Sequence, residues 1–149
     1  MIPINDNAPV KIEKRIEIEV PLEVVWEILT DINKWSEWNP NVKKAKLKGE
    51  LLSGTSFDWI RDGAKITSTI HTIEPFRLFG WSGKAFGSYG IHNWKLENKN
   101  GTTEVISVES MEGLLMNIFR GFMKNNLETY MINWLNSLKR EAEDQYYNV

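Results

Sequence analysis

The amino-acid sequence predicts one α+β domain in which a seven-stranded, strongly bent antiparallel sheet wraps around a long C-terminal helix. Three observations predict this fold class: apolar and charged residues alternate near the N-terminus, six further strand-like segments precede residue 112, and a helical pattern runs from Leu114 to Glu143. A chain of 149 residues has the usual size of one domain. We therefore expect a single unit over residues 1–149, with its ordered core at about 11–143.

The first strand is predicted from Lys11 to Val20, where apolar residues alternate with glutamate and arginine. This period of two is typical of a strand with one buried face. Pro21 ends the strand and suits the start of a helix, where its missing N–H needs no partner. Apolar residues at helical spacing continue to Leu29, and a short second helix is expected between Asp31 and Pro40. Two short helices should therefore follow the first strand.

Six strand-like segments occupy the middle of the chain. They lie near residues 42–49, 55–61, 65–73, 77–83, 89–97 and 102–111, with turn-forming residues such as Ser53-Gly54 and Asp62-Gly63 between them. Short links between consecutive strands favour an antiparallel meander. Four lysines, at 43, 44, 46 and 48, indicate that the first of these segments is a solvated edge strand. The alternative for the lysines is a phosphate-binding patch.

A helix of about thirty residues closes the chain, beginning after Gly113. Its apolar stripe is expected to face the sheet and comprises Leu115, Phe119, Phe122, Met123, Leu127, Met131, Trp134 and Leu138. Gly121 costs a helix about 1 kcal/mol relative to alanine. We therefore expect a bend or a close backbone contact at Gly121.

Composition and charge argue against several classes of function. The formal net charge of −2 and the pI near 5.8 lack the basic excess of nucleic-acid-binding proteins, so no nucleic-acid partner is expected. With no cysteine and two histidines predicted on opposite faces, we expect no metal site and no cofactor. No apolar run is long enough for an integral membrane segment, and no signal peptide is evident. A cytoplasmic protein is the resulting expectation, and its oligomeric state stays open.

Several short motifs occur in a characteristic order between about Lys11 and Glu143. They are Ile16–Pro21 followed by Val24–Trp26, Trp38-Asn39-Pro40, Glu74-Pro75, His92-Asn93-Trp94, Gly101-Thr102-Thr103 and Trp134-Leu135. In this order they resemble the START-like (SRPBCC) helix-grip superfamily, in its polyketide cyclase/dehydrase-like branch. The resemblance implies a cavity between the sheet and the C-terminal helix. It also implies a small hydrophobic or aromatic ligand, such as a lipid, a polyketide or an isoprenoid-like compound.

Strand parity and the helical stripe together predict the lining of this cavity, because alternate residues of a strand share a face. The candidates from the sheet are Phe57, Trp59, Ile66, Ser68, Ile70, Phe79, Trp81, His92, Trp94, Ser107, Glu109 and Met111, and those from the helix are Phe119, Phe122, Met123 and Leu127. Their bulky side chains either form a packed core or surround a pocket with a few polar groups. Trp26 and Trp35, on the early helices, are expected to lie away from the ligand.

His92 and Glu109 form the candidate polar pair, since parity places them on the inner face of neighbouring strands. They either satisfy each other, anchor a ligand carbonyl or hydroxyl, or act as an acid–base couple. The side chain of Arg61 is expected to curl out to solvent, although it could form an ion pair with a ligand carboxylate. His71 has the opposite parity and is expected at the surface.

Three functions are compatible with these residues. The first is binding of a small hydrophobic molecule without altering it. The second is a cofactor-free cyclase or dehydrase, a lyase or isomerase in which His92 or Glu109 removes a proton next to a carbonyl. The third is a protein-interaction or chaperone-associated module. The charge-rich outer faces show no obvious apolar patch, which argues against this third function.

Overall fold

A computed structural model describes residues 1–85 and 87–148. Seven strands form one antiparallel sheet in the order β1-β7-β6-β5-β4-β3-β2. Their bounds are β1 Val10–Ile18, β2 Val42–Leu47, β3 Ser56–Arg61, β4 Ala64–Glu74, β5 Leu78–Ala85, β6 Ser88–Lys99 and β7 Thr102–Glu112. Strands β2 to β7 pair in chain order and β1 adds to the β7 edge, so the meander is confirmed. The lysine-rich β2 lies at the other edge, as predicted.

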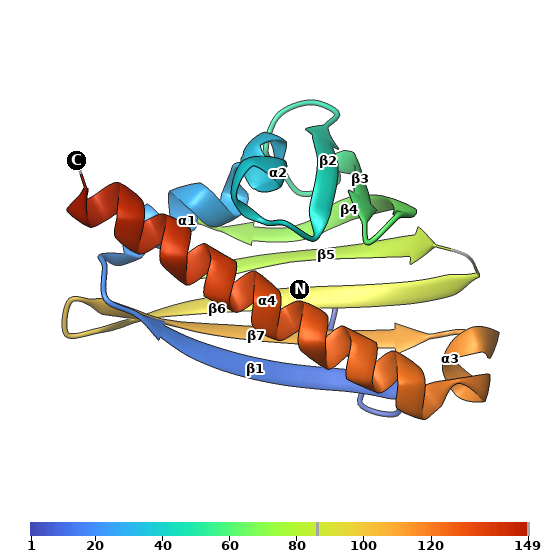
Figure 1. The fold of residues 1–149 in the computed structure, drawn as a ribbon. Coiled ribbons are helices and arrows are strands. Elements are labelled where there is room, and N and C mark those ends of the chain that lie inside the picture. The colour runs from blue at the N-terminus through green and yellow to red at the C-terminus, as the bar shows by residue number, and fades with distance from the viewer. Residues whose placement is uncertain (86, 149) are drawn as a thin grey trace.

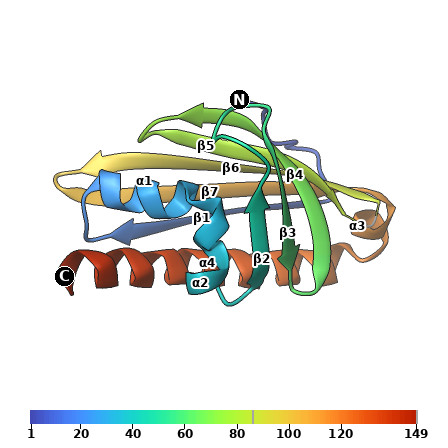
Figure 2. The same ribbon diagram turned by 90° about the horizontal axis from the view of Figure 1, so that it is seen from above.

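The helices lie on one face of this sheet. They are α1 Leu22–Thr30, the 3-10 helix η1 Ile32–Lys34, α2 Trp35–Trp38, α3 Leu114–Ile118 and α4 Arg120–Tyr147. Figure 1 shows α4 crossing the sheet diagonally from the α3 corner to α1, and Figure 2 shows β2, β3 and β4 bending sharply over towards it. The predicted helix-grip fold is confirmed. Among the helices that the structure describes, none is both long and apolar enough to cross a membrane.

The last helix differs from the prediction, because it is divided into α3 and α4. Phe119 separates them with backbone angles of φ −109° and ψ 36°, which turn the chain out of the helical path. The bend expected at Gly121 therefore falls two residues earlier. Helix α4 also continues beyond Glu143 to Tyr147. This early break changes which side chains face the sheet at the start of α4.

A cluster of aromatic rings fills the interior beneath α2. The indole of Trp35 lies 5.0 Å from that of Trp134 and 5.2 Å from that of Trp81, measured between ring centroids. Phe57 and Trp59 complete the cluster, mostly in edge-to-face arrangements, which aromatic pairs favour. Trp35 is fully buried at the centre of this cluster. Side chains leave little space at this end of the molecule.

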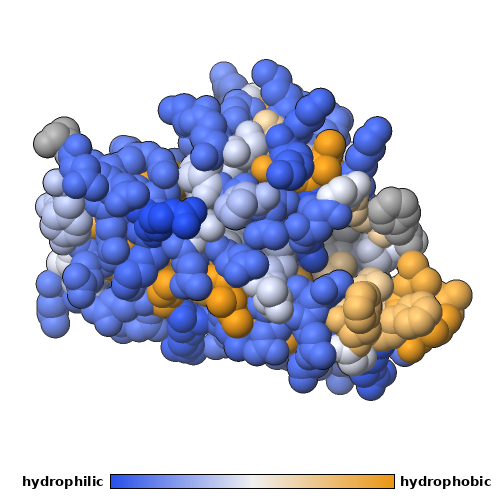
Figure 3. Space-filling model, in the orientation of Figure 1, coloured by the Kyte–Doolittle hydropathy of each residue, from blue (hydrophilic) through white to orange (hydrophobic). Residues whose placement is uncertain are grey.

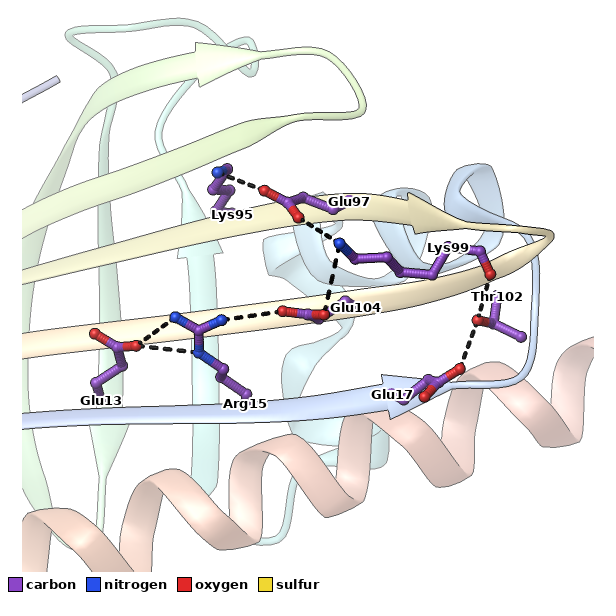
Figure 4. A network of polar contacts seen from close by, with 8 residues as sticks. All are labelled: Glu13, Arg15, Glu17, Lys95, Glu97, Lys99, Thr102 and Glu104. Carbon is purple, nitrogen blue, oxygen red and sulfur yellow. Dashed lines mark hydrogen bonds and ion pairs between the residues drawn. The ribbon is translucent and has the colours of Figure 1, made fainter.

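Charged residues cover the outer face of β1, β6 and β7 (Figure 4). Arg15 bridges Glu13 and Glu104 at 3.0 and 3.2 Å. The carboxylate of Glu97 accepts hydrogen bonds from the ammonium groups of Lys95 and Lys99, and these contacts lower the pKa of Glu97 to about 2. Exposed ion pairs of this kind add little stability individually. They do establish that this face of the sheet is solvated, which leaves the opposite face to form the interior.

Candidate functional site

A cavity of about 250 Å³ lies between the inner face of the sheet and the α3–α4 segment. Its lining consists of Trp59, Arg61, Ala64, Ile66, Ser68, Trp81, Gly83, Ala85, Ser88, Gly90, His92, Glu109, Met111, Leu115, Met116 and Met123. The walls are mostly apolar, and the polar groups come mainly from β3, β4, β6 and β7. This composition is typical of a site for a small organic molecule.

Small residues on β5 and β6 create the space. Gly83 and Gly90 lie directly opposite each other in the sheet, and Ala85 and Ser88 follow at the end of the same hairpin. Away from the hairpin turn, the inward side chains of the same two strands are large, as at the opposed pair Trp81 and His92. The interior is therefore filled at the α2 end and hollow at the α3 end. This run of small residues on inward positions is the sequence signal that would have located the cavity.

Half of the predicted candidates line the cavity, namely Trp59, Ile66, Ser68, Trp81, His92, Glu109, Met111 and Met123. Six others are buried in the surrounding core: Phe57, Ile70, Phe79, Trp94, Ser107 and Leu127. The structure adds lining residues that the parity argument does not include, among them Ala64, Ala85, Ser88, Leu115 and Met116.

The placement of Phe119 and Phe122 in the cavity is wrong. Their side chains are 51% and 65% exposed, and neither lines the cavity. The physical reason is the break at Phe119, which rotates the start of α4 relative to a continuous helix. As a result Met123, rather than Phe122, faces the interior.

A buried polar cluster forms one part of the wall. His92 and Glu109 are direct cross-strand partners, with His92 Nδ1 at 3.4 Å from Glu109 Oε2. The other imidazole nitrogen, Nε2, makes a hydrogen bond of 2.7 Å with Ser107 Oγ. Arg61 does not curl out to solvent as expected: its Nη1 donates to Glu109 Oε1 at 3.2 Å, and its side chain is only 16% exposed. The guanidinium also lies 3.9 Å from the ring centre of Tyr130, where cation–π attraction holds it.

The charges of this cluster follow from its burial. Desolvation lowers the pKa of His92 from 6.5 to about 4, since the opposing attraction of Glu109 is partly offset by the charge of Arg61. His92 is therefore neutral at neutral pH, with one ring nitrogen able to donate and the other to accept. Burial likewise raises the pKa of Tyr130 well above 10, so its phenol keeps its proton.

Three polar atoms of the cluster lack a hydrogen bond within the described residues: the Tyr130 hydroxyl, His92 Nδ1 and Glu109 Oε2. His92 Nδ1 and Glu109 Oε2 are 3.4 Å apart, which is longer than a usual N–H···O hydrogen bond, and no hydrogen bond joins them. Buried polar atoms nearly always have a hydrogen-bond partner. Where two such atoms without a partner lie at the wall of a cavity, a bound molecule can supply the missing hydrogen bonds. A hydroxyl group could satisfy both atoms, because it donates to a carboxylate and also hydrogen-bonds an imidazole nitrogen.

His71 faces away from the cavity, as parity predicts, but it is not freely exposed. The backbone N–H of Ile2 lies 3.4 Å from His71 Nδ1, so the N-terminal segment covers part of the ring. Within residues 1–85 and 87–148, no three metal-ligating side chains lie close enough together to hold an ion.

Solved structures share this architecture along nearly their whole length. A hypothetical protein from Helicobacter pylori has a TM-score of 0.83 and 16% identity, with 95% of this chain and 97% of that chain covered. The Zhui aromatase/cyclase from a Streptomyces species has a TM-score of 0.81 and 17% identity, with 91% and 94% covered. A START superfamily protein from Mycobacterium smegmatis has a TM-score of 0.79 and 12% identity, with 91% and 98% covered.

At these identities the structural similarity establishes the fold alone. A search of curated protein sequences gave no significant match. The sequence itself supplies the family, because residues 9–143 match the family described as polyketide cyclase/dehydrase and lipid transport. That match covers the sheet, the early helices and most of α4. The chain thus belongs to the polyketide cyclase/dehydrase and lipid transport family and has a helix-grip fold.

Proposed function

We propose that this chain binds a small, mostly apolar molecule that carries a hydroxyl group, and holds it in the cavity beside His92 and Glu109. The observation that carries the proposal is the pair of unpaired polar atoms, His92 Nδ1 and Glu109 Oε2, at the wall of an otherwise apolar cavity. A bound hydroxyl would recover the hydrogen bonds that these buried atoms lack. Apolar contacts with Trp59, Trp81 and Met123 would supply the remaining affinity.

The cavity volume limits the size of this molecule. A volume of about 250 Å³ lies below the roughly 300–1,000 Å³ that is usual for sites of drug-sized compounds. A ligand of one or two rings therefore fits better than a long acyl chain.

The protonation state of the wall favours binding over catalysis. A general base works best when its pKa is close to the working pH. Burial holds the pKa of His92 at about 4, which makes it a weak base, and Arg61 engages one oxygen of Glu109. These groups are better suited to receive a hydrogen bond than to remove a proton from carbon. The cyclase hypothesis is therefore the less well supported of the two.

Naphthol and naphthalene test the proposal, because they differ by one hydroxyl group. Each should change the tryptophan emission saturably, since Trp59 and Trp81 line the cavity. Glu109→Gln should weaken naphthol binding about tenfold or more, from the loss of a charge-assisted hydrogen bond, and leave naphthalene binding unchanged. Glu128→Gln, at a half-buried carboxylate of α4 that pairs with Lys14 away from the cavity, is the matched control and should affect neither compound.

Glu109→Gln also leaves Arg61 without its buried partner, which can destabilise the fold. If that variant does not fold, Arg61→Met/Glu109→Met removes both charges together and should show the same selective loss for naphthol. Equal losses for naphthol and naphthalene would contradict the hydroxyl anchor. Emission that neither compound changes would contradict ligand binding in this cavity altogether.

A further inference from the structure

An exposed apolar patch lies at the corner where α3 meets α4. It consists of Leu114, Leu115, Ile118, Phe119 and Phe122, whose exposed fractions range from 40% to 73%. Figure 3 shows hydrophobic side chains gathered over α3 and the start of α4, on a face that is otherwise mostly hydrophilic. The expectation that the surface lacks an apolar patch is therefore wrong. Contiguous exposed apolar side chains mark an interaction surface.

The segment that carries the apolar patch is positively charged. Between Gly113 and Asn126 the chain contains Arg120 and Lys124 but no aspartate or glutamate. Both cations are exposed, and neither forms an ion pair with any residue that the structure describes. Apolar side chains next to unpaired cations complement a lipid surface with anionic headgroups. A symmetric contact with a second copy would instead bring the cations of both copies together.

The apolar patch continues into the cavity. Leu115 belongs to both, since its side chain is partly exposed and also lines the cavity. Met116 and Met123, from the same short segment, face the cavity. An apolar molecule that entered here from a lipid surface would pass from one apolar environment to another along a single stretch of chain. This continuity is the reason to connect the patch with lipid rather than with an unrelated partner.

We propose that the α3–α4 corner docks on the surface of an anionic lipid bilayer. The apolar patch enters the headgroup region, and Arg120 and Lys124 contact lipid phosphates. The protein lies on the membrane without spanning it, in the manner of an interfacial amphipathic helix. This docking extends the proposed function but does not depend on it, since it requires no ligand in the cavity.

Flotation with vesicles tests the docking. The protein should bind vesicles made of equal parts phosphatidylcholine and phosphatidylglycerol, and bind phosphatidylcholine vesicles less. Phe119→Ser/Phe122→Ser should reduce binding at least tenfold, while Leu52→Ser/Ile132→Ser, at exposed apolar residues elsewhere, should not. Circular dichroism and a melting curve establish that each variant is folded.

The charges are tested separately. Arg120→Gln/Lys124→Gln should weaken binding to the anionic vesicles by about fivefold for each charge removed. Its control is Lys43→Gln/Lys46→Gln, at exposed lysines of β2, which should have little effect.

Three outcomes would overturn the docking. The first is that the wild-type protein does not float with anionic vesicles. The second is that the control variants lose as much binding as the patch variants. The third is a dimer in sedimentation velocity that Phe119→Ser/Phe122→Ser converts to a monomer, which would assign the patch to a second copy. Naphthol binding without vesicles reports on the cavity alone, so failure of the docking and failure of the proposed function are distinguishable.

Discussion

Glu109 divides its two carboxylate oxygens between different partners. Oε1 accepts from Arg61 at 3.2 Å, whereas Oε2 faces the neutral ring of His92 without a hydrogen bond. A buried charge is stable only when its remaining polar atoms are also satisfied. Burying this oxygen without any hydrogen-bond partner would cost free energy. The proposed hydroxyl-bearing ligand would remove that cost, which is why we expect it to bind more tightly than its hydrocarbon analogue.

The buried imidazole of His92 should make stability depend on pH. Its pKa of about 4 is below the ordinary value of 6.5, so the unfolded chain binds a proton that the folded protein does not. As the pH falls from about 6.5 to about 4, the free energy of unfolding should drop by about 3 kcal/mol from this group, and no further below that range. Urea denaturation across these pH values measures the change. His92→Gln should lose this part of the dependence; an unaltered profile in that variant would contradict the assignment.

Strand parity is sufficient to predict that His92 and Glu109 face each other. The β6–β7 ladder has no bulge between Lys99 and Tyr89, so the alternation carries through without a change of face. Parity is not sufficient for Arg61. Its long side chain starts at the end of β3 and can turn either way, and the carboxylate that draws it inward lies 48 residues later in the sequence. Such a partner is evident only in three dimensions.

At the scale of elements, the break between α3 and α4 limits what helical periodicity can predict. The stripe from Leu127 to Leu138 is buried as expected, because α4 is continuous there. Before it, the apolar residues keep helical spacing in the sequence although Phe119 leaves the helical conformation. Apolar spacing alone cannot reveal a single residue with a different backbone angle. The stripe therefore predicts the core correctly from Met123 onwards, but not at Phe119 or Phe122.

Two aromatic residues of this predicted stripe should differ in their contribution to stability. Trp134 is buried among Trp35, Trp59 and Trp81, so Trp134→Ala should lower the free energy of unfolding by about 3–5 kcal/mol. Phe122 is exposed, and Phe122→Ala should stay within about 0.5 kcal/mol of the wild type. Urea denaturation of both variants measures the difference. A cost for Phe122→Ala near that of Trp134→Ala would mean that Phe122 is packed in the interior.

At the scale of the whole molecule, the interior has two unlike ends. The tryptophan cluster occupies the end beneath α2, and the small residues of the β5–β6 hairpin surround the cavity at the end beneath α3. The sequence is sufficient to predict the fold and the side of the sheet that faces inward, since both follow from periodicity. It is not sufficient to predict which part of that face stays empty. That depends on how the volumes of all facing side chains add up in space.

Gly83 and Gly90 test this description because they are opposite each other but have different surroundings. A Cβ at Gly90 would make only ordinary contacts, the nearest at 3.7 Å from Glu109 Oε1. Gly90→Val should therefore place its side chain in the cavity and weaken naphthol binding about tenfold. A Cβ at Gly83 would lie 2.5 Å from Ser68 Oγ and 3.0 Å from the backbone oxygen of Thr67. Gly83→Ala should lower the melting temperature.

The measurements are a melting curve and a naphthol titration for each variant. Gly90→Ala is the milder control, and it should retain both the stability and most of the affinity of the wild type. If Gly90→Val binds naphthol as well as the wild type does, the ligand does not occupy the space beside Gly90. If Gly83→Ala melts at the wild-type temperature, Ser68 and the backbone of β4 can move aside more easily than their close contacts indicate.

The separation of the two ends bears on how this protein can evolve. Ala85 and Gly90 help to determine the size of the cavity and lie outside the aromatic core around Trp35 and Trp134, whereas Trp59 and Trp81 belong to both. Single substitutions in the first group can change the accepted molecule while the second group keeps the fold intact. Selection on ligand preference can then proceed in small steps without compensating changes elsewhere. A scaffold built in this way can diversify its specificity faster than its architecture.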